Sequence, residues 1–367
     1  MAEVIANFSA GPSALPRSVR QAMAEELLPQ ADASPSIVEV SHRGPMFARV
    51  AEELADRLAN TMGVADSHHV LLLQGGANLQ FAQLPLNLAQ AAPAGFIVTG
   101  HWGVKALAEA ERVAQTHVIA STEASGFTTL PGELKCHTPV AYAHVTGNET
   151  VHGVQFDHPP TLNDASGQAV PVVADLSSEF LSRPYPYASL AGFYAGTQKN
   201  LGVAGLTVVG LDKDWWARVA RGRGHRLAKY LDYQAWIEAG SMFNTPSTVA
   251  WYAALLMLRW IEAQGGLAAL ELRNRQKAQR LYACIDDSDL FYNPVDPVAR
   301  SQMNVVFALA DPHLHDGFLA QAEDAGLLGL KGHRAVGGLR ASLYNAIEIE
   351  AVEALIAFMQ EFERRHG

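Results

Sequence analysis

The sequence predicts an α/β protein: a large domain with a mostly parallel, seven-stranded sheet flanked by helices, followed by a smaller C-terminal α/β domain. Short apolar runs alternate with segments of helical periodicity, which is typical of a largely parallel sheet. The chain of 367 residues is also longer than one hydrophobic core usually organises. We therefore expect a large domain over residues 12–258 and a small domain formed by residues 259–367 together with residues 1–11.

Seven apolar runs are the candidate strands of the large sheet. They are residues 70–73, 96–99, 117–120, 140–145, 170–174, 192–195 and 206–211. The segments between most of them are long enough for the helices of crossover connections, which parallel strands require. These runs therefore define the order in which the sheet is built along the chain.

Helix signals punctuate the rest of the sequence. After Pro45, apolar residues recur on one helical face, and Gly63 marks the stop. A longer helix is predicted to begin with Thr245 as N-cap and Pro246 in the first position, and to run to Gly265. In the tail, residues 304–309 and 339–342 are predicted strands, and residues 313–326 and 348–365 are predicted helices.

Composition excludes several classes of protein. With a net charge of -10, the chain has no overall field that attracts nucleic acid or an anionic membrane. No apolar stretch reaches the ~18 residues of a membrane span, and no signal peptide is evident. Cys136 and Cys284 have neither disulfide-scaffold nor metal-type spacing. We expect a cytoplasmic protein without a metal, in which a local basic cluster binds any anionic substrate.

Three polar features follow predicted strands, where open α/β sheets place ligand sites. Residues 74–78 (Gln-Gly-Gly-Ala-Asn) form a turn whose backbone N–H groups suit a phosphate, although such glycines often serve the turn alone. Asp175 follows the run 170–174, where capping a helix is the alternative role. Lys199 lies between an apolar strand and glycine turns, and a poorly solvated lysine loses its proton more easily.

Asp175 and Lys199 together carry more information than either residue alone. Pyridoxal phosphate requires a carboxylate for its ring nitrogen and an amine for its aldehyde. An aspartate some two dozen residues before a lysine, both at strand ends of one sheet, provides this pair. The pattern therefore predicts a pyridoxal-phosphate enzyme.

Seven motifs in the chain resemble, in order and with similar spacing, those of the phosphoserine aminotransferases. They are NFSAGP at residues 7–12, VSHRG at 40–44, GNET at 147–150, AD at 174–175, GTQKN at 196–200, GSMFNTP at 240–246 and KGHR at 331–334. The resemblance extends from about residue 5 to the end of the chain. It implies the aspartate-aminotransferase-like fold (fold type I), pyridoxal 5'-phosphate as cofactor, and a homodimer whose active sites are completed across the interface.

The resemblance also implies a role for individual cofactor-binding residues. Lys199 would hold the cofactor as a Schiff base, Asp175 would pair with its ring nitrogen, Trp102 would stack on the ring, and Thr150 would bond its phenolic oxygen. The phosphate would be surrounded by Ala77, Asn78, Gln198, Asn244 and Thr245, the last two from a second subunit. Relatives often carry serine or arginine where this chain has Asn78, whose amide can still donate to a phosphate but lacks the charge of arginine.

The substrate-binding residues implied by the resemblance are basic. Arg340 matches the arginine that binds the α-carboxylate, and its planar fork suits a bidentate contact. The pairs His42-Arg43 and His333-Arg334 match the cluster for a phosphate or a distal carboxylate. The implied reaction transfers an amino group between L-glutamate and 3-phosphohydroxypyruvate, a step of serine biosynthesis.

Three alternatives remain. A cysteine desulfurase shares the cofactor residues but needs a thiolate on a mobile loop, and neither Cys136 nor Cys284 has that setting. A non-catalytic carrier of pyridoxal phosphate would have no need of Arg340 and both His-Arg pairs. A phosphorylated hydroxythreonine precursor in pyridoxine biosynthesis would also suit the same basic cluster as amino acceptor.

Overall fold

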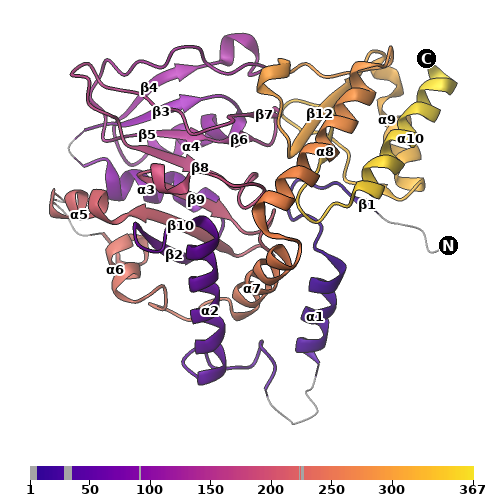
Figure 1. The fold of residues 1–367 in the computed structure, drawn as a ribbon. Helices are drawn as coiled ribbons and strands as arrows, with labels where there is room; N and C mark the ends of the chain where they lie inside the picture. The colour runs from indigo at the N-terminus through magenta and orange to yellow at the C-terminus, as the bar shows by residue number, and fades with distance from the viewer. Residues whose placement is uncertain (1–5, 29–34, 91, 223, 225–226) are drawn as a thin grey trace.

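A seven-stranded sheet forms the centre of the large part of the structure (Figure 1). The computed structural model describes residues 6–28, 35–90, 92–222, 224 and 227–367. The strand order is β2-β10-β9-β8-β5-β3-β4, and only β10 runs antiparallel to its neighbours. The strands are β2 (His68–Gln74), β3 (Ala94–Val98), β4 (Thr116–Ser121), β5 (Tyr142–Thr146), β8 (Val172–Asp175), β9 (Gly192–Gly196) and β10 (Leu206–Asp212). The predicted mostly parallel sheet is confirmed.

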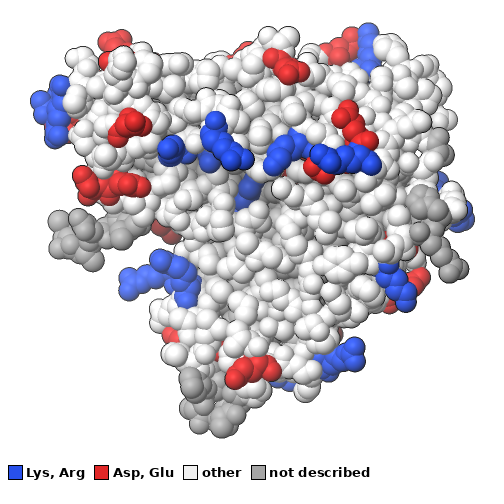
Figure 2. Space-filling view, turned by 180° about the vertical axis from the view of Figure 1, so that it is seen from behind, with Lys and Arg blue, Asp and Glu red and all other residues white. Residues whose placement is uncertain are grey.

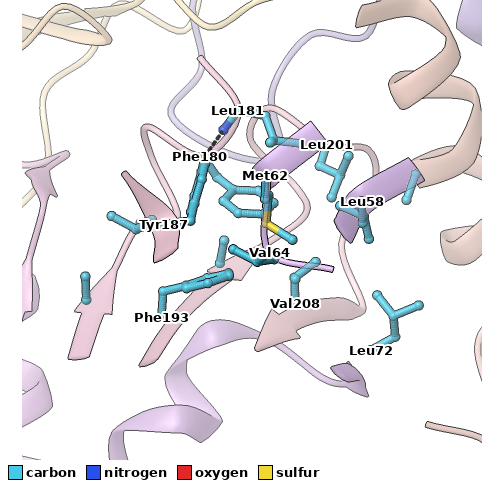
Figure 3. Packing of buried hydrophobic residues seen from close by; sticks show 14 of the residues in the cluster. Leu58, Met62, Val64, Leu72, Phe180, Leu181, Tyr187, Phe193, Leu201 and Val208 are labelled. Carbon is cyan, nitrogen blue, oxygen red and sulfur yellow. Dashed lines mark hydrogen bonds between the residues drawn. The ribbon is translucent and has the colours of Figure 1, made fainter. Parts of the chain in front are cut away.

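Helices cover both faces of this sheet, because consecutive residues of its strands are apolar and their side chains point to opposite faces. In β2, Leu72 packs in a cluster with α2 and α7, whereas Leu71 and Leu73 pack in a separate cluster with α3 and α4. This alternation follows from the two-residue period of a strand. Figure 3 shows the first cluster, in which Phe180, Tyr187 and Phe193 lie against one another and the Tyr187 hydroxyl accepts a hydrogen bond from the Leu181 amide at 3.1 Å.

The α-helices for which the sequence contains a strong stop signal end close to the predicted residue. The α-helices are α1 (Arg17–Leu27), α2 (Pro45–Met62), α3 (Gln80–Leu88), α4 (His101–Ala110), α5 (Lys213–Gly222), α6 (Tyr233–Glu238), α7 (Thr248–Ala263), α8 (Gly266–Asp286), α9 (His315–Asp324) and α10 (Ile349–His366). Gly63 follows α2 in the left-handed conformation, with φ of 68°, as a helix stop requires. Among the described helices, none is long and apolar enough to cross a membrane.

The predicted start of the long helix at Pro246 is wrong. Helix α7 begins at Thr248, with Ser247 as the cap residue. The Thr245 carbonyl accepts a hydrogen bond from the Gln74 side chain, and the Thr248 hydroxyl donates to the Ile37 carbonyl at 2.7 Å. These contacts with distant segments hold residues 245–247 outside the helix.

The C-terminal part of the chain contains its own sheet and core. Strands β11 (Phe291–Tyr292), β12 (Asn304–Leu309) and β14 (Leu339–Ser342) form a three-stranded antiparallel sheet. The N-terminal strand β1 (Ala6–Asn7) pairs in parallel with β13 (Leu327–Leu328). Ala6 and Phe8 therefore join the C-terminal hydrophobic cluster, while the division at residue 258 stays a prediction. Two further short strands, β6 (Asn148–Glu149) and β7 (Val154–Gln155), pair beside the large sheet.

A buried cation connects α8 to the turn that follows β14. Lys277 is only 2% exposed. Its ammonium group donates to the carbonyls of Leu343, Tyr344 and Ile347 at 3.0, 2.9 and 2.9 Å. Burial lowers the pKa of Lys277 to about 7, yet three acceptors match the three N–H donors of the charged form. The turn thus has its carbonyls satisfied by a single side chain.

We predict that Lys277→Met destabilises the protein by about 3 kcal/mol or more, because three buried carbonyls lose their donor. Thermal unfolding followed by circular dichroism should show a melting temperature several degrees lower. Arg275→Met is the matched control in the same helix, since Arg275 is exposed and pairs with Glu271 at 2.9 Å. Equal melting temperatures for the two variants would contradict the prediction.

Candidate active site

A pocket of about 280 Å³ lies at the carboxyl ends of the parallel strands. Seven of the predicted cofactor residues line it: Ala77, Asn78, Trp102, Thr150, Asp175, Gln198 and Lys199. They come from segments up to 122 residues apart, from residue 77 to residue 199. The fold brings them together because the carboxyl ends of β2, β3, β5, β8 and β9 lie along the same edge of the sheet, where β10 begins between β2 and β9.

The amine of Lys199 lies inside this pocket among groups that restrict its solvation. It donates to the Thr150 hydroxyl oxygen at 2.9 Å and lies 5.9 Å from the centroid of the Trp102 ring. Burial lowers the pKa of Lys199 to about 8, although the negative charge of Asp175 opposes that shift. A lysine with this pKa has a useful share of neutral, nucleophilic amine near neutral pH.

Asp175 ends β8 and is 6% exposed. Its Oδ1 accepts the Ser177 amide at 2.9 Å, and its carboxylate also accepts a hydrogen bond from the Tyr194 hydroxyl. Burial raises the pKa of Asp175, while these hydrogen bonds and the charge of Lys199 oppose the rise. No helix begins directly after it in the described chain, where residues 177–181 form turns. Helix capping is therefore not its role.

The glycine turn after β2 leads into a short 3-10 helix, Ala77–Leu79, and then into α3. Gly75 has a φ of 101°, a conformation that favours glycine. Ala77, Asn78 and Gln198 line the pocket beside this turn, so the backbone can approach an anion there. The structure does not bring Asn244 and Thr245 to the pocket of their own chain, and their predicted role across a subunit interface stays a prediction.

Arg340 lines a larger cavity of about 930 Å³ and contacts Thr150, which lines the smaller pocket. It is 8% exposed, and its Nη1 donates to the Thr150 carbonyl at 3.4 Å. Its Nε is buried without a hydrogen-bond partner among the described residues. His333 and Arg334 line the same cavity. A planar guanidinium with free donors is thus held next to the cofactor pocket, as binding of a carboxylate requires.

The surface charge is uneven despite the net charge of -10. Figure 2 shows a band of Lys and Arg side chains across the upper half of one face.

His42 and Arg43 line neither the pocket nor the larger cavity in their own chain; they precede α2. A single chain therefore assembles only part of the predicted anion-binding cluster, and the role of His42 and Arg43 stays a prediction.

Several residues that line the pocket had no predicted role. Thr146 ends β5, and Ser177 and Ser178 follow Asp175. Their position at the same sheet edge is a signal that the strand-end rule offers. Phe81 and Asn148 also line the pocket, but only tertiary packing places them there.

The residues present fit pyridoxal phosphate. The pocket offers an amine, a carboxylate, a hydroxyl group and the face of an indole ring. Trp102 Nε1 and Thr146 Oγ1 are buried without a hydrogen-bond partner in the part of the chain that the structure describes. Buried polar atoms without partners are costly and rare, so a ligand that supplies partners suits this pocket.

Comparison with known proteins decides the family. Residues 5–355 match the family model for class-V aminotransferases. A phosphoserine aminotransferase of Pseudomonas entomophila is 44% identical over 98% of both chains, and one of Nitrosomonas europaea is 42% identical over 99% of both. The chain belongs to the class-V aminotransferases, in the phosphoserine aminotransferase family. The predicted family and the predicted transaminase activity are thereby confirmed.

Solved structures agree with this assignment. The phosphoserine aminotransferase of Bacillus circulans subsp. alkalophilus superimposes with a TM-score of 0.92 at 40% identity, covering 98% of this chain and 99% of that one. The pyridoxal-phosphate-bound enzyme of Trichomonas vaginalis gives a TM-score of 0.89 at 34% identity, covering 96% and 99%. These likenesses confirm the predicted fold and support pyridoxal phosphate as the cofactor.

We predict that the Lys199 amine of the cofactor-free protein titrates near pH 8. Only the neutral amine is nucleophilic, so the rate of its acetylation by acetic anhydride should rise about tenfold per pH unit up to pH 8 and then level off. Peptide mass spectrometry at each pH measures this rate, with exposed lysines in the same digest correcting for reagent loss. A rate that still rises tenfold per unit at pH 10 would contradict the assigned environment.

Proposed function

We propose that this chain is a transaminase that exchanges the amino group between L-glutamate and 3-phosphohydroxypyruvate, giving O-phospho-L-serine and 2-oxoglutarate on pyridoxal 5'-phosphate. The observation that carries the proposal is the amine of Lys199 in the same buried pocket as the Asp175 carboxylate, next to Arg340. Relatives at 42–44% identity over nearly the whole chain bear the corresponding name.

Asp175 would hold the ring nitrogen of the bound cofactor in its protonated form. When bound, pyridoxal phosphate supplies an electron sink for the negative charge that develops at the substrate α-carbon. A carboxylate ~4 Å from a protonated ring nitrogen stabilises it by about 4 kcal/mol at an effective dielectric of ~20. Burial raises the pKa of Asp175, and the hydrogen bonds from the Ser177 amide and the Tyr194 hydroxyl oppose that rise and so favour its ionised form.

Lys199 transfers the proton that defines transamination. With pyridoxal phosphate bound, its neutral amine would accept the α proton of the amino donor and then return that proton within the pocket, which regenerates the neutral amine. The Thr150 hydroxyl, 2.9 Å from the amine, restricts the directions in which the amine can point. Trp102 covers the same side of the pocket, since its ring lies within 5.9 Å of the amine.

Arg340 binds the α-carboxylate that both substrates share, and the His333-Arg334 pair binds the phosphate or the distal carboxylate. Both sites line the 930 Å³ cavity, which is large enough for the substrate to extend from Arg340 toward the pair. A phosphorylated hydroxythreonine precursor carries the same two anionic ends, so it is a second acceptor for the same site.

A homodimer completes the site in this proposal. His42, Arg43, Asn244 and Thr245 match motif positions of the family but do not line either cavity of their own chain, which supports their supply to a second subunit. We also place the protein in the cytoplasm, where its two thiols, Cys136 and Cys284, stay reduced. The division into residues 12–258 and the remainder belongs to the same proposal.

The two rival functions fit less well. A desulfurase requires a reactive thiolate at the pocket, but burial raises the pKa of both Cys136 and Cys284, and neither lines it. A carrier protein would have no use for a buried arginine with free donors beside the cofactor. Both observations favour transamination.

The visible spectrum of the purified protein tests the function. We expect an absorption band of bound pyridoxal phosphate that L-glutamate converts to the band of pyridoxamine phosphate and that 3-phosphohydroxypyruvate restores. Lys199→Ala should show no steady-state turnover, because it lacks both the covalent anchor and the proton carrier. A band that glutamate leaves unchanged, or turnover by Lys199→Ala, would refute the proposal. Replacing the acceptor by the phosphorylated hydroxythreonine precursor ranks the two acceptors.

We predict that Arg340→Met lowers kcat/KM about 100-fold for glutamate and for the phosphorylated acceptor alike, because a charge-assisted contact worth roughly 3 kcal/mol is lost from both. Arg334→Met is the matched control: the same substitution in the same cavity should weaken the phosphorylated acceptor more than glutamate. Steady-state kinetics with each substrate varied in turn measures both effects. Opposite patterns would exchange the two assigned roles.

A further inference from the structure

The first turn of α4 is held by two side chains from the segment after β5. The first N–H groups of a helix have no partner inside the helix. Here the Trp102 amide donates to Glu149 Oε2 at 3.0 Å, and the Gly103 amide donates to Glu149 Oε1 at 2.8 Å. The His101 amide donates to His152 Nδ1 at 3.1 Å. Three consecutive N–H groups of α4 are therefore occupied by the protein itself.

The chain makes room for this carboxylate. A Cβ atom at Gly100 would lie 2.6 Å from Glu149 Cδ, and one at Gly103 would lie 3.3 Å from Glu149 Oε1. Real Cβ atoms essentially never approach as closely as the first distance. Glycine at position 100 is thus required by the approach of Glu149, and not by its extended backbone.

Glu149 is fully buried, at 0% exposure, so its charge depends on these two amides. Burial raises the pKa of Glu149 to about 7, and the amides of Trp102 and Gly103 oppose the rise. The amino end of a helix also stabilises a negative charge. Both oxygens of the carboxylate accept, which an amide side chain cannot reproduce because one of its two ends is a donor.

The position of Glu149 in the chain connects this anchor to the reacting amine. Its neighbour Thr150 is the hydrogen-bond partner of Lys199. Glu149 itself holds helix α4, and that helix carries the Trp102 ring, whose centroid is 5.9 Å from the same amine. The indole Nε1 has no partner among the described residues. Packing contacts apart, the ring is therefore placed by the backbone of α4 and not by a bond of its own.

We infer that Glu149 is a positioning residue, which fixes the Trp102 ring against the bound cofactor by holding the first turn of α4 with its carboxylate. The inference rests on the proposed placement of the cofactor between Trp102 and Lys199. Glu149 itself does not line the pocket, so it acts through Trp102 and not by contact with the reacting atoms.

Glu149→Gln tests the inference with almost no change in volume. One backbone amide keeps an acceptor and the other faces an NH₂ group. We expect cofactor affinity to fall about tenfold, as loss of one charge-assisted hydrogen bond predicts, with weaker induced circular dichroism in the visible band. The factor by which kcat falls should be larger than the factor by which the KM for glutamate changes. Gly100→Ala, which displaces the carboxylate without changing charge, should give the same spectral signature and serves if Glu149→Gln does not fold.

Glu179→Gln is the matched control. Glu179 is likewise buried, but it binds Arg183 and Gln155 and does not line the pocket. This variant should melt at a lower temperature yet keep the wild-type dissociation constant and circular dichroism of the cofactor. Loss of stability alone is thereby separated from loss of positioning.

Trp102→Leu separates failure of this inference from failure of the proposed function. If Trp102→Leu weakens cofactor binding but Glu149→Gln and Gly100→Ala behave as wild type, Glu149 has no positioning role and the proposed function stands. If Trp102→Leu itself leaves affinity and circular dichroism unchanged, the proposed cofactor placement is wrong, and the inference is overturned with it.

Discussion

The burial of Lys199 together with Asp175 is the constraint on which the site depends. An ionised group without a partner is expensive to bury, and burial alone would drive an amine toward its neutral form and a carboxyl group toward its protonated form. Each charge here opposes the shift of the other. The amine is left with a pKa near 8, between the value of a solvated lysine and that of an isolated buried one. The cover of this sheet edge by Phe81 of α3 and Trp102 of α4 makes this balance possible, because open access of water would remove the desolvation.

A network of buried hydrogen bonds between amide and hydroxyl side chains joins residues that line that pocket to the C-terminal sheet. The Asn148 amide group donates to Ser178 Oγ and to Asn304 Oδ1, both at 2.8 Å, and Asn304 in turn donates to Ser342 Oγ at 2.9 Å. Asn148 and Ser178 line the cofactor pocket, whereas Ser342 lies on β14, the strand that carries Arg340. Buried networks are stiff and specific where their members are paired, and here Asn148 Oδ1, which belongs to a pocket-lining residue, lacks a partner among the described residues. The same hydrogen-bond network therefore fixes the pocket and the strand that carries Arg340.

Residues at strand ends were predictable from the sequence, whereas residues that act through tertiary contacts were not. Asp175 and Lys199 follow apolar runs whose period and length define strands, so their meeting at one edge follows from the fold class. The start of α7 depends on a bond from Gln74, which no local signal reveals. Glu149 belongs to a recognised motif, yet its carboxylate accepts hydrogen bonds from backbone amides of a distant helix. That helix begins 48 residues earlier in the chain, at His101. His42 and Arg43 belong to a recognised motif, yet they line neither cavity of their own chain, and no local signal in the sequence predicts that placement.

The anion-binding side of the site shows how a chain with an excess of acidic residues can hold positive charge ready. Burial lowers the pKa of His333, and so do the charges of Arg340, Arg334 and Lys105; the pKa of His101, whose ring centroid is 4.7 Å from that of His333, is lowered in the same way. Neutral histidines beside arginines reduce the repulsion that the cluster would otherwise carry without a ligand. An arriving phosphate or carboxylate reverses the local sign and favours the protonated form of the same rings. Under the proposed function the arginines would provide fixed charge and the histidines charge that the ligand itself induces, which would suit a site for anions of different charge in alternate half-reactions.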